Sequence, residues 1–328
     1  MNKAGKMPQI GGNNSTIIYV AAILNAVIVG LSFLFTKVAL EATSPIDTLG
    51  YRFLIGWFVL TGYMILFKKQ NFEFKIGSKK TFFSLCVLAL FYPILFFSFQ
   101  AFGLDYTSSA EGGIILAFSP ALTAILAAFF IKEKINGIQL LFIALSILGV
   151  VYIFLMNGTE LHVSQTKLVG YFFLIISCIS ISGYAVAARF LSKSFSPFQL
   201  TYVMVTFGML FFNLYAIGEK LRYGEVIEYI TLVKNLDFVG AVLFLGVFAT
   251  MLTAFLSNYV LSKLTASKMS IFSNLSTIIS ILAGAIFLKE EIMFYHIIGS
   301  VMIITGVLGT NLYKDKAPSM SVKKMDFK

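Results

Sequence analysis

Apolar stretches of about 20 residues recur along this sequence, and each is long enough to cross a lipid bilayer as a helix. There are ten of them, at residues 17–38, 49–67, 81–102, 109–131, 138–156, 168–188, 198–217, 238–258, 269–288 and 293–312. Within hydrocarbon, backbone N–H and C=O groups must find partners inside the protein, so runs of this length favour helices. The sequence therefore predicts an all-α integral membrane protein with ten transmembrane helices.

The composition argues against a soluble enzyme. Hydrophobic residues make up 58% of the 328 positions and charged residues 12%, whereas about a quarter of the residues in soluble domains are charged. The chain has two His and two Cys, and both cysteines, Cys86 and Cys178, lie within apolar runs. We therefore expect no enzymatic activity, no cofactor and no metal site.

The basic residues are distributed as in membrane proteins with a defined topology. The net charge is +10, and Lys and Arg concentrate in alternate loops, most densely at 68–80. Such loops mark the cytoplasmic side. This places residues 1–16 and 314–328 in the cytoplasm, and the polar segment 218–237 outside as a loop. The basic surface favours anionic lipid headgroups over nucleic acid, in a plasma membrane or a bacterial inner membrane.

Part of the first half of the chain recurs in the second half. Residues 105–151 align without a gap with residues 262–308, and Lys132-Glu133 then matches Lys289-Glu290. Both copies read as an apolar helix, a short charged break and a second apolar helix. The alignment predicts a duplicated unit.

The duplication divides the chain into two five-helix repeats, predicted at 17–156 and 168–313. Because five is an odd number, the second repeat would be inverted in the membrane relative to the first. Inverted repeats are typical of transporters that work by alternating access, with the substrate site near the bilayer midplane.

Prolines and polar side chains inside the apolar runs indicate where the two repeats would enclose a site. Tyr92-Pro93 and Ser119-Pro120 should bend their helices, because proline leaves a carbonyl without its helical donor. Such bends are tolerated in a membrane only against protein or water. The residues predicted to line a central substrate-binding cavity are Asn25, Tyr92, Ser119, Ser177, Tyr184, Ser270, Asn274 and Thr277. Ordinary packing between membrane helices is the alternative role for the Ser and Thr side chains.

Charged residues near the ends of the apolar runs are candidates for coupling or gating. Glu111 lies about one turn below the predicted external surface, where a carboxylate needs a partner or a function. It would either pair with Lys37 or Arg52, or take up a proton or the amine of a substrate. Its counterpart in the second repeat is Lys268, near the predicted cytoplasmic surface. Arg52 would either snorkel to lipid headgroups or bind a substrate or carboxylate.

Three further residues have structural interpretations. Glu133 and Glu290 each precede an apolar run, where a carboxylate would face the positive end of the following helix dipole. His296 is expected at the membrane surface.

Several residues form a pattern found in one group of transporters. They are Gly30, Phe35, Lys37, Pro45, Arg52 and the mutually repeated segments 107–135 and 264–292. Through them nearly the whole chain resembles the ten-helix transporters of the drug/metabolite transporter superfamily that are built from two EamA domains. Leu31 stands where these proteins often have a tryptophan.

The resemblance implies a secondary transporter of a small molecule. Similar proteins are mostly bacterial exporters of amino acids, other metabolites or toxic compounds, and eukaryotic relatives carry nucleotide sugars and phosphorylated metabolites. The candidate cavity residues are neutral and hydrogen-bonding, which favours a small zwitterion such as an amino acid over a polyanion, with Glu111 coupling transport to protons. A channel and a passive membrane scaffold remain open as alternatives.

Overall fold

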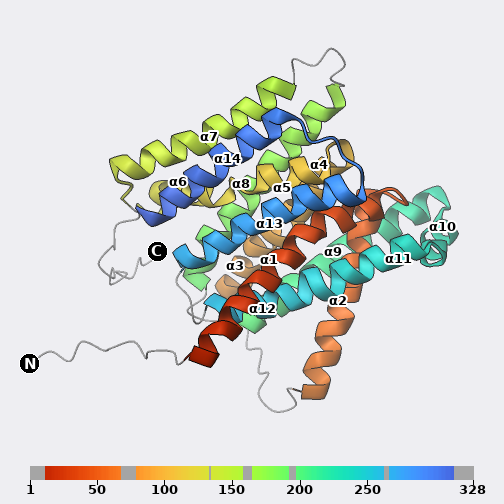
Figure 1. Ribbon diagram of the computed structural model, residues 1–328. Helices are drawn as coiled ribbons and strands as arrows, with labels where there is room; N and C mark the ends of the chain where they lie inside the picture. The colour runs from red at the N-terminus through yellow and green to blue at the C-terminus, as the bar shows by residue number, and fades with distance from the viewer. Residues whose placement is uncertain are drawn as a thin grey trace, which may run out of the picture.

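The computed structural model describes residues 12–67, 79–132, 134–157, 165–191, 197–261 and 266–313, and these ranges contain helices and no strands (Figure 1). The helices are α1 (Gly12–Leu40), α2 (Pro45–Phe67), α3 (Lys79–Ala89), η1 (Leu90–Leu95), α4 (Phe96–Tyr106), α5 (Ser109–Leu116), α6 (Ser119–Ile131), α7 (Gly137–Asn157), α8 (Gln165–Leu191), α9 (Pro197–Tyr223), α10 (Val226–Thr231), η2 (Leu232–Lys234), α11 (Leu236–Leu243), η3 (Phe244–Leu252), α12 (Thr253–Leu261), α13 (Ala266–Phe287) and α14 (Phe294–Leu312). The segments η1 and η3 are π-helical, and η2 is a 3₁₀-helix.

Within the described ranges, nine helical stretches are long and apolar enough to cross a membrane. Three of them are composite: α3, η1 and α4 form one, α5 and α6 another, and α11, η3 and α12 a third. Helix α13 contributes a shorter apolar helix, Asn274–Phe287. The chain is thus an all-helical multi-pass membrane protein, and a tenth crossing by α13 stays a prediction.

Both predicted proline breaks are present. The backbone at Tyr92, just before Pro93, is non-helical with φ −146° and ψ 114°. Helix α5 ends at Leu116 and α6 begins at Ser119, directly before Pro120. Pro120 cannot donate to the Leu116 carbonyl, and the Ser119 hydroxyl donates to that oxygen instead, at 2.7 Å. The side chain thereby satisfies a carbonyl that the proline has freed.

Several helix pairs join the first half of the chain to the second half. Helix α1 packs against α13, and α8 packs against α5 and α6. Helices α2 and α9 pair with each other, as do α7 and α14, which lie side by side in Figure 1. The start of α1 and the end of α14 lie on the same side of the bundle, opposite α10. We call the end of the bundle that carries α10 the predicted external end.

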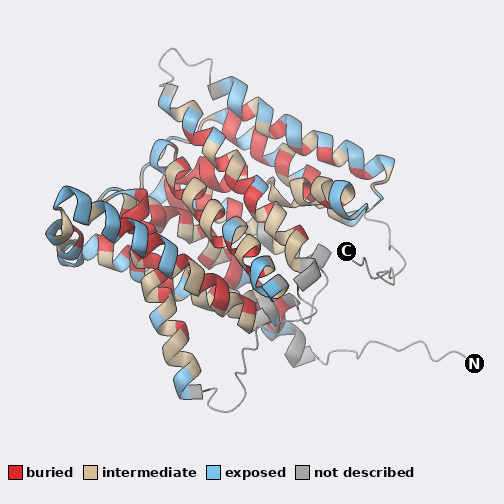
Figure 2. Cartoon of the chain, turned by 180° about the vertical axis from the view of Figure 1, so that it is seen from behind, coloured by how far each residue is buried: buried red, intermediate tan, exposed pale blue. Residues whose placement is uncertain are grey.

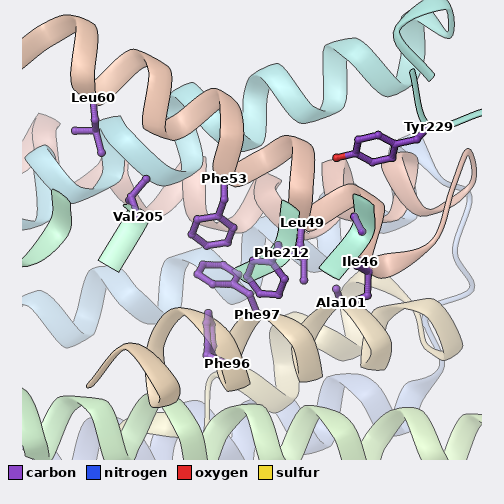
Figure 3. Packing of buried hydrophobic residues seen from close by; sticks show 11 residues of the cluster. Ile46, Leu49, Phe53, Leu60, Phe96, Phe97, Ala101, Val205, Phe212 and Tyr229 are labelled. Atoms are coloured by element: carbon purple, nitrogen blue, oxygen red, sulfur yellow. The ribbon is translucent and has the colours of Figure 1, made fainter. Parts of the chain in front are cut away.

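The interior of the bundle is closely packed, and its outer surface is apolar. Buried residues concentrate where helices meet (Figure 2). One cluster joins α2, α4 and α9 through the rings of Phe53, Phe97 and Phe212, which gather in Figure 3. Large apolar side chains such as Leu66 and Phe129 are exposed on the outside. Exposed apolar area of this extent suits lipid contact.

The segment 218–237 is more ordered than the predicted polar loop. Helix α9 continues to Tyr223, and α10 brings Tyr229 into the protein. The Tyr229 hydroxyl donates to Asn213 Oδ1 at 3.3 Å, and burial, with Tyr51 and Asp47 adding to it, raises the pKa of that hydroxyl. The connection between the two membrane-spanning stretches is thus partly helical, and its place outside the membrane stays a prediction.

Candidate functional site

A cavity of about 410 Å³ lies between the two halves of the chain. Helices α1, α2, η1, α4, α5 and α6 contribute to its wall from the first half, and α8, α9, η3, α12 and α13 from the second. The lining residues are Val29, Ser32, Phe33, Arg52, Phe53, Tyr92, Phe96, Phe97, Gln100, Gly113, Leu116, Ala117, Ser119, Pro120, Ile181, Tyr184, Thr201, Met204, Val205, Ala249, Thr250, Thr253, Ala254, Ser257, Ser276 and Thr277. Aromatic rings and hydroxyl groups dominate this wall, as in sites for small organic molecules.

Four of the eight predicted cavity residues line it: Tyr92, Ser119, Tyr184 and Thr277. The rings of Tyr92 and Tyr184 lie 4.9 Å apart, centroid to centroid, and join the two halves across the cavity wall. Thr277 Oγ1 donates to the Gly113 carbonyl at 3.3 Å, again from one half to the other. The segments interrupted by Pro93 and Pro120 thus lie against α8 and α13 of the second half at this cavity.

The other predicted cavity residues lie elsewhere or are outside the described part. Asn25 is buried behind the wall, where its Oδ1 accepts a hydrogen bond from the lining residue Ser257 at 3.2 Å. Ser177 is buried and donates to the Phe96 carbonyl at 2.9 Å. Asn274 is buried as well and does not line the cavity. The side chains of Ser270 and Lys268 lie outside the described residues.

Arg52 lies in the cavity wall and is 4% exposed, so the prediction that it snorkels to headgroups was wrong. Its Nε donates to Thr250 Oγ1 at 3.2 Å, and its guanidinium carbon lies 4.3 Å from the centroid of the Phe97 ring. The sequence placed the helix start at residue 49, whereas α2 begins at Pro45. Arg52 is therefore about two turns inside the helix rather than one.

Glu111 forms a buried cluster with side chains from the second half. Its Oε1 lies 2.9 Å from Lys167 Nζ and 3.3 Å from His296 Nε2, and it also accepts a hydrogen bond from the Tyr171 hydroxyl. Its Oε2 accepts from the backbone N–H of Ser108 at 2.9 Å, as part of a capping box at the start of α5. We call Glu111, Lys167, Tyr171 and His296 the Glu111 cluster.

The cluster corrects two predictions. The partner of Glu111 is Lys167, not Lys37 or Arg52, and Lys37 Nζ donates instead to the Leu104 carbonyl at 2.8 Å. His296 is 3% exposed and not at the surface. A sequence signal for the cluster existed, because Lys167 and His296 both start apolar runs at the predicted external end, where Glu111 also lies.

Glu290 neutralises a helix dipole, but not the one expected. Its carboxylate accepts hydrogen bonds from the backbone N–H groups of Ser109, at 2.6 Å, and Ala110, at 3.0 Å. These groups open α5 in the other half, whereas α14, the helix that follows Glu290, starts at Phe294. The equivalent prediction for Glu133 falls outside the described residues.

Other polar contacts between the halves gather at the same end of the bundle. Lys220 Nζ lies 3.4 Å from Asp47 Oδ2, and Asn213 Nδ2 donates to the Gly50 carbonyl at 3.0 Å. The Tyr51 hydroxyl donates to the Tyr229 carbonyl at 2.8 Å. With Glu290 and the Glu111 cluster, these contacts hold the two halves together at the predicted external end.

Comparison with known proteins agrees with this architecture. The model of the EamA-like transporter family matches residues 16–155 and 168–312. The Bacillus subtilis (strain 168) protein "Uncharacterized transporter YcxC" is 41% identical over 315 residues, which cover 95% of this chain and 99% of the relative. "Uncharacterized transporter YetK" from the same organism is 29% identical over 300 residues, covering 92% of this chain and 88% of the relative.

A solved crystal structure shares the fold. It superposes with a TM-score of 0.58 at 17% sequence identity, over 92% of this chain and 98% of the other. The family model covers most of both halves, and a relative is similar along almost its whole length. The chain therefore belongs to the EamA-like transporter family, within the drug/metabolite transporter superfamily.

Proposed function

We propose that this protein is a secondary transporter that moves a small metabolite through the central cavity by alternating access. The observation that carries the proposal is the cavity itself, whose wall comes from both halves of the chain. The polar contacts between the halves at one end, through Glu111 and Glu290, supply a gate whose opening would expose the cavity to that side. Alternating access needs two states that exchange, one with this gate closed and one with it open.

Two inverted five-helix repeats, with ten crossings and both termini in the cytoplasm, are the architecture we propose for this mechanism. Lys132 and Lys289, which match in the repeat alignment, lie one and two residues after the ends of α6 and α13, and both have a left-handed backbone, at φ 58° and φ 56°. The π-helical segments η1 and η3 occupy the third membrane-spanning stretch of each half. The family match to residues 16–155 and again to 168–312 supports the same division.

The substrate we propose is an amino acid or a related small metabolite, and the direction is export. The volume of about 410 Å³ is at the lower end of the range for small-molecule sites. The tyrosine pair Tyr92 and Tyr184 offers aromatic surface, and Ser119 and Thr277 offer hydroxyl groups beside it. A nucleotide sugar would need more room and more cationic partners.

Glu111 is the residue we propose for proton coupling. Its charge is matched by Lys167, with His296 and Tyr171 on the same oxygen and Lys37 in electrostatic range. A proton taken up by Glu111 from outside would remove the charge that holds Lys167, and would loosen α5 from α8. The gate would then open, and release of the proton would favour closure.

Counter-flow in proteoliposomes tests the transporter proposal. Liposomes with the full-length protein are loaded with an unlabelled amino acid and diluted into a trace of the same labelled compound, across a panel of amino acids and nucleotide sugars. A carrier accumulates label transiently above equilibrium, and the accumulation saturates with solute. Equilibration without overshoot would indicate a channel, and absence of protein-dependent flux for the whole panel would indicate a scaffold.

A further inference from the structure

Arg52 is the charged residue in the wall of the cavity. Among the described residues that line it there is no Asp, Glu, Lys or His beside this arginine. In the part of the chain that the structure describes, no carboxylate lies within ion-pair distance of the guanidinium, and Thr250 is its hydrogen-bond partner. Within the described ranges, the cavity wall therefore carries one positive charge that no neighbouring carboxylate compensates.

A buried guanidinium without a counter-ion is costly for a membrane protein. Arginine stays protonated at any physiological pH and offers five N–H donors in a planar fork. One of these donors, on Nε, is used by Thr250. The other four are on the two terminal nitrogens, whose geometry matches both oxygens of a carboxylate. A site that keeps such a group buried is explained if its counter-ion comes with a ligand.

The guanidinium is held in place from two sides. Thr250 Oγ1 accepts from Nε and itself donates to the Leu245 carbonyl at 2.9 Å, inside the π-helical segment η3. The Phe97 ring lies under the guanidinium carbon at 4.3 Å. A purely structural link between α2 and η3 would need one donor, and a neutral side chain could supply it. Such a link explains neither the positive charge of Arg52 nor the four N–H donors on its terminal nitrogens.

We propose that Arg52 binds the carboxylate of the transported solute, so that the protein selects small organic monocarboxylates, amino acids among them. The proposal rests on the transporter function proposed above. Phe53 and Phe96, next to Arg52 and Phe97 in the wall, would contact the apolar part of such a solute. The Tyr92 hydroxyl, in electrostatic range of Arg52, would share the anion. One cation in the wall suits one negative charge and disfavours polyanions.

Matched solutes and matched variants test this inference. Full-length protein in liposomes is assayed by counter-flow with leucine, with leucinamide, which lacks the carboxylate, and with the corresponding keto acid, which lacks the ammonium. A second set, made of phenylalanine, its amide and its keto acid, tests solutes with a larger apolar side chain. Arg52→Gln removes the charge, and Arg52→Lys keeps the charge but removes the fork. Arg222→Gln is the control, because Arg222 is an exposed arginine outside the cavity.

The wild-type protein and Arg222→Gln should prefer the acids over the amides by about tenfold or more, as for a charge-assisted hydrogen bond. Arg52→Gln should lose this preference, and Arg52→Lys should retain part of it. If Arg52→Gln does not insert, the test uses the inserted Arg52→Lys protein, whose preference for acids over amides should be smaller than that of the wild type. Equal preference in wild type and inserted Arg52 variants would overturn the inference and leave the transporter proposal intact. If the wild-type protein transported the amides alone, the role of Arg52 would also be overturned and the transporter proposal would stand. If no solute showed saturable flux, both the role of Arg52 and the transporter proposal would be overturned.

Discussion

Glu111 is a buried carboxylate whose charge is matched by side chains from the other half of the chain. An unpaired carboxylate at this depth would cost about 2.5 kcal/mol or more. Lys167, at 2.9 Å, supplies the opposite charge, and the Ser108 backbone N–H and the Tyr171 hydroxyl supply hydrogen bonds. One residue thus both caps α5 and contacts the other half of the chain, so a change of its charge should act directly on the gate proposed above.

Glu111→Gln should leave the protein folded but weaken proton-driven transport. Glutamine keeps the size and the hydrogen-bonding capacity of the side chain, and Lys167 is 32% exposed at its side chain and can be solvated. We expect uptake driven by a pH gradient in proteoliposomes to fall by about tenfold, equivalent to ~1.4 kcal/mol. Solute exchange without a gradient should fall less, because exchange needs no net proton movement.

The matched control is Glu225→Gln, which removes a carboxylate whose side chain is 44% exposed beside Lys220, outside the Glu111 cluster. It should transport like the wild type. Normal proton-driven uptake by Glu111→Gln at every external pH would mean that the carboxylate serves the scaffold alone. Failure of this variant to insert would mean that the ion pair with Lys167 is needed for folding.

The residue-level site was partly predictable from sequence. The depth of Glu111 follows from its position in an apolar run, but its partner does not. Lys167 lies on another helix, and the sequence offered Lys37 at a similar depth. Arg52 was misplaced because the polar start of α2, from Pro45 to Thr48, did not read as apolar. Placing the start of α2 one helical turn too late was enough to predict a headgroup contact for Arg52, which in fact lies in the cavity wall.

At the level of the elements, prolines identified two of the helix breaks but could not identify a third. Pro93 and Pro120 predict the interruptions near η1 and between α5 and α6. The segment η3 has no proline, and its π-helical turn is accompanied by the Thr250 hydroxyl, which donates to the Leu245 carbonyl. A threonine in an apolar run can have many roles, so the sequence did not predict the π-helical turn in η3.

The α7–α14 pair depends on the small residue Gly149. A methyl group at that position would lie 2.9 Å from the Gly299 carbonyl oxygen, and this backbone atom cannot move without moving α14. Small residues allow this close approach between membrane helices. Gly149→Ala should therefore destabilise the protein by about 1–3 kcal/mol, as for an overpacked site.

Thermal unfolding of the detergent-purified protein checks this expectation. Gly62→Ala is the control, since a methyl group on Gly62, in α2, would meet no atom within 4 Å. It should leave the unfolding temperature unchanged or slightly raised, because alanine favours helix over glycine. An equal, small effect of both substitutions would show that α7 and α14 can separate slightly at no cost.

At the scale of the whole molecule, the proposed inverted arrangement makes a prediction about sidedness. Lys134, between α6 and α7, and Glu228, in α10, are exposed and lie at opposite ends of the bundle. Single cysteines at these positions, in a Cys86→Ser, Cys178→Ser background, should react with an impermeant thiol reagent from opposite sides of sealed vesicles. Glu228→Cys should react from outside. Reaction of both positions from the same side would contradict the topology.

The fold class could be predicted from the sequence because hydrocarbon leaves the chain few options. Runs such as 138–156 span the membrane as helices. The matching Lys132 and Lys289 follow the ends of α6 and α13 in the same left-handed backbone conformation. The composition of the cavity wall was harder to predict. Ser177 and Thr277 are both polar residues in apolar runs, yet one bonds to the Phe96 carbonyl and the other lines the cavity. Rotation of a helix about its axis decides between them, and sequence does not fix that rotation.

Alternating access itself is tested most directly by the reactivity of a cysteine at Ala249, a small residue in the cavity wall. The measurement is the rate of reaction with an impermeant thiol reagent from each side of sealed vesicles, in the cysteine-free background, with and without Glu111→Gln. If two states exchange, loosening the gate at the predicted external end shifts the population toward the outward-open state. The external rate should then rise while the cytoplasmic rate falls. Rates that rise together would indicate a continuous pore, and a cysteine that reacts from neither side would contradict the account.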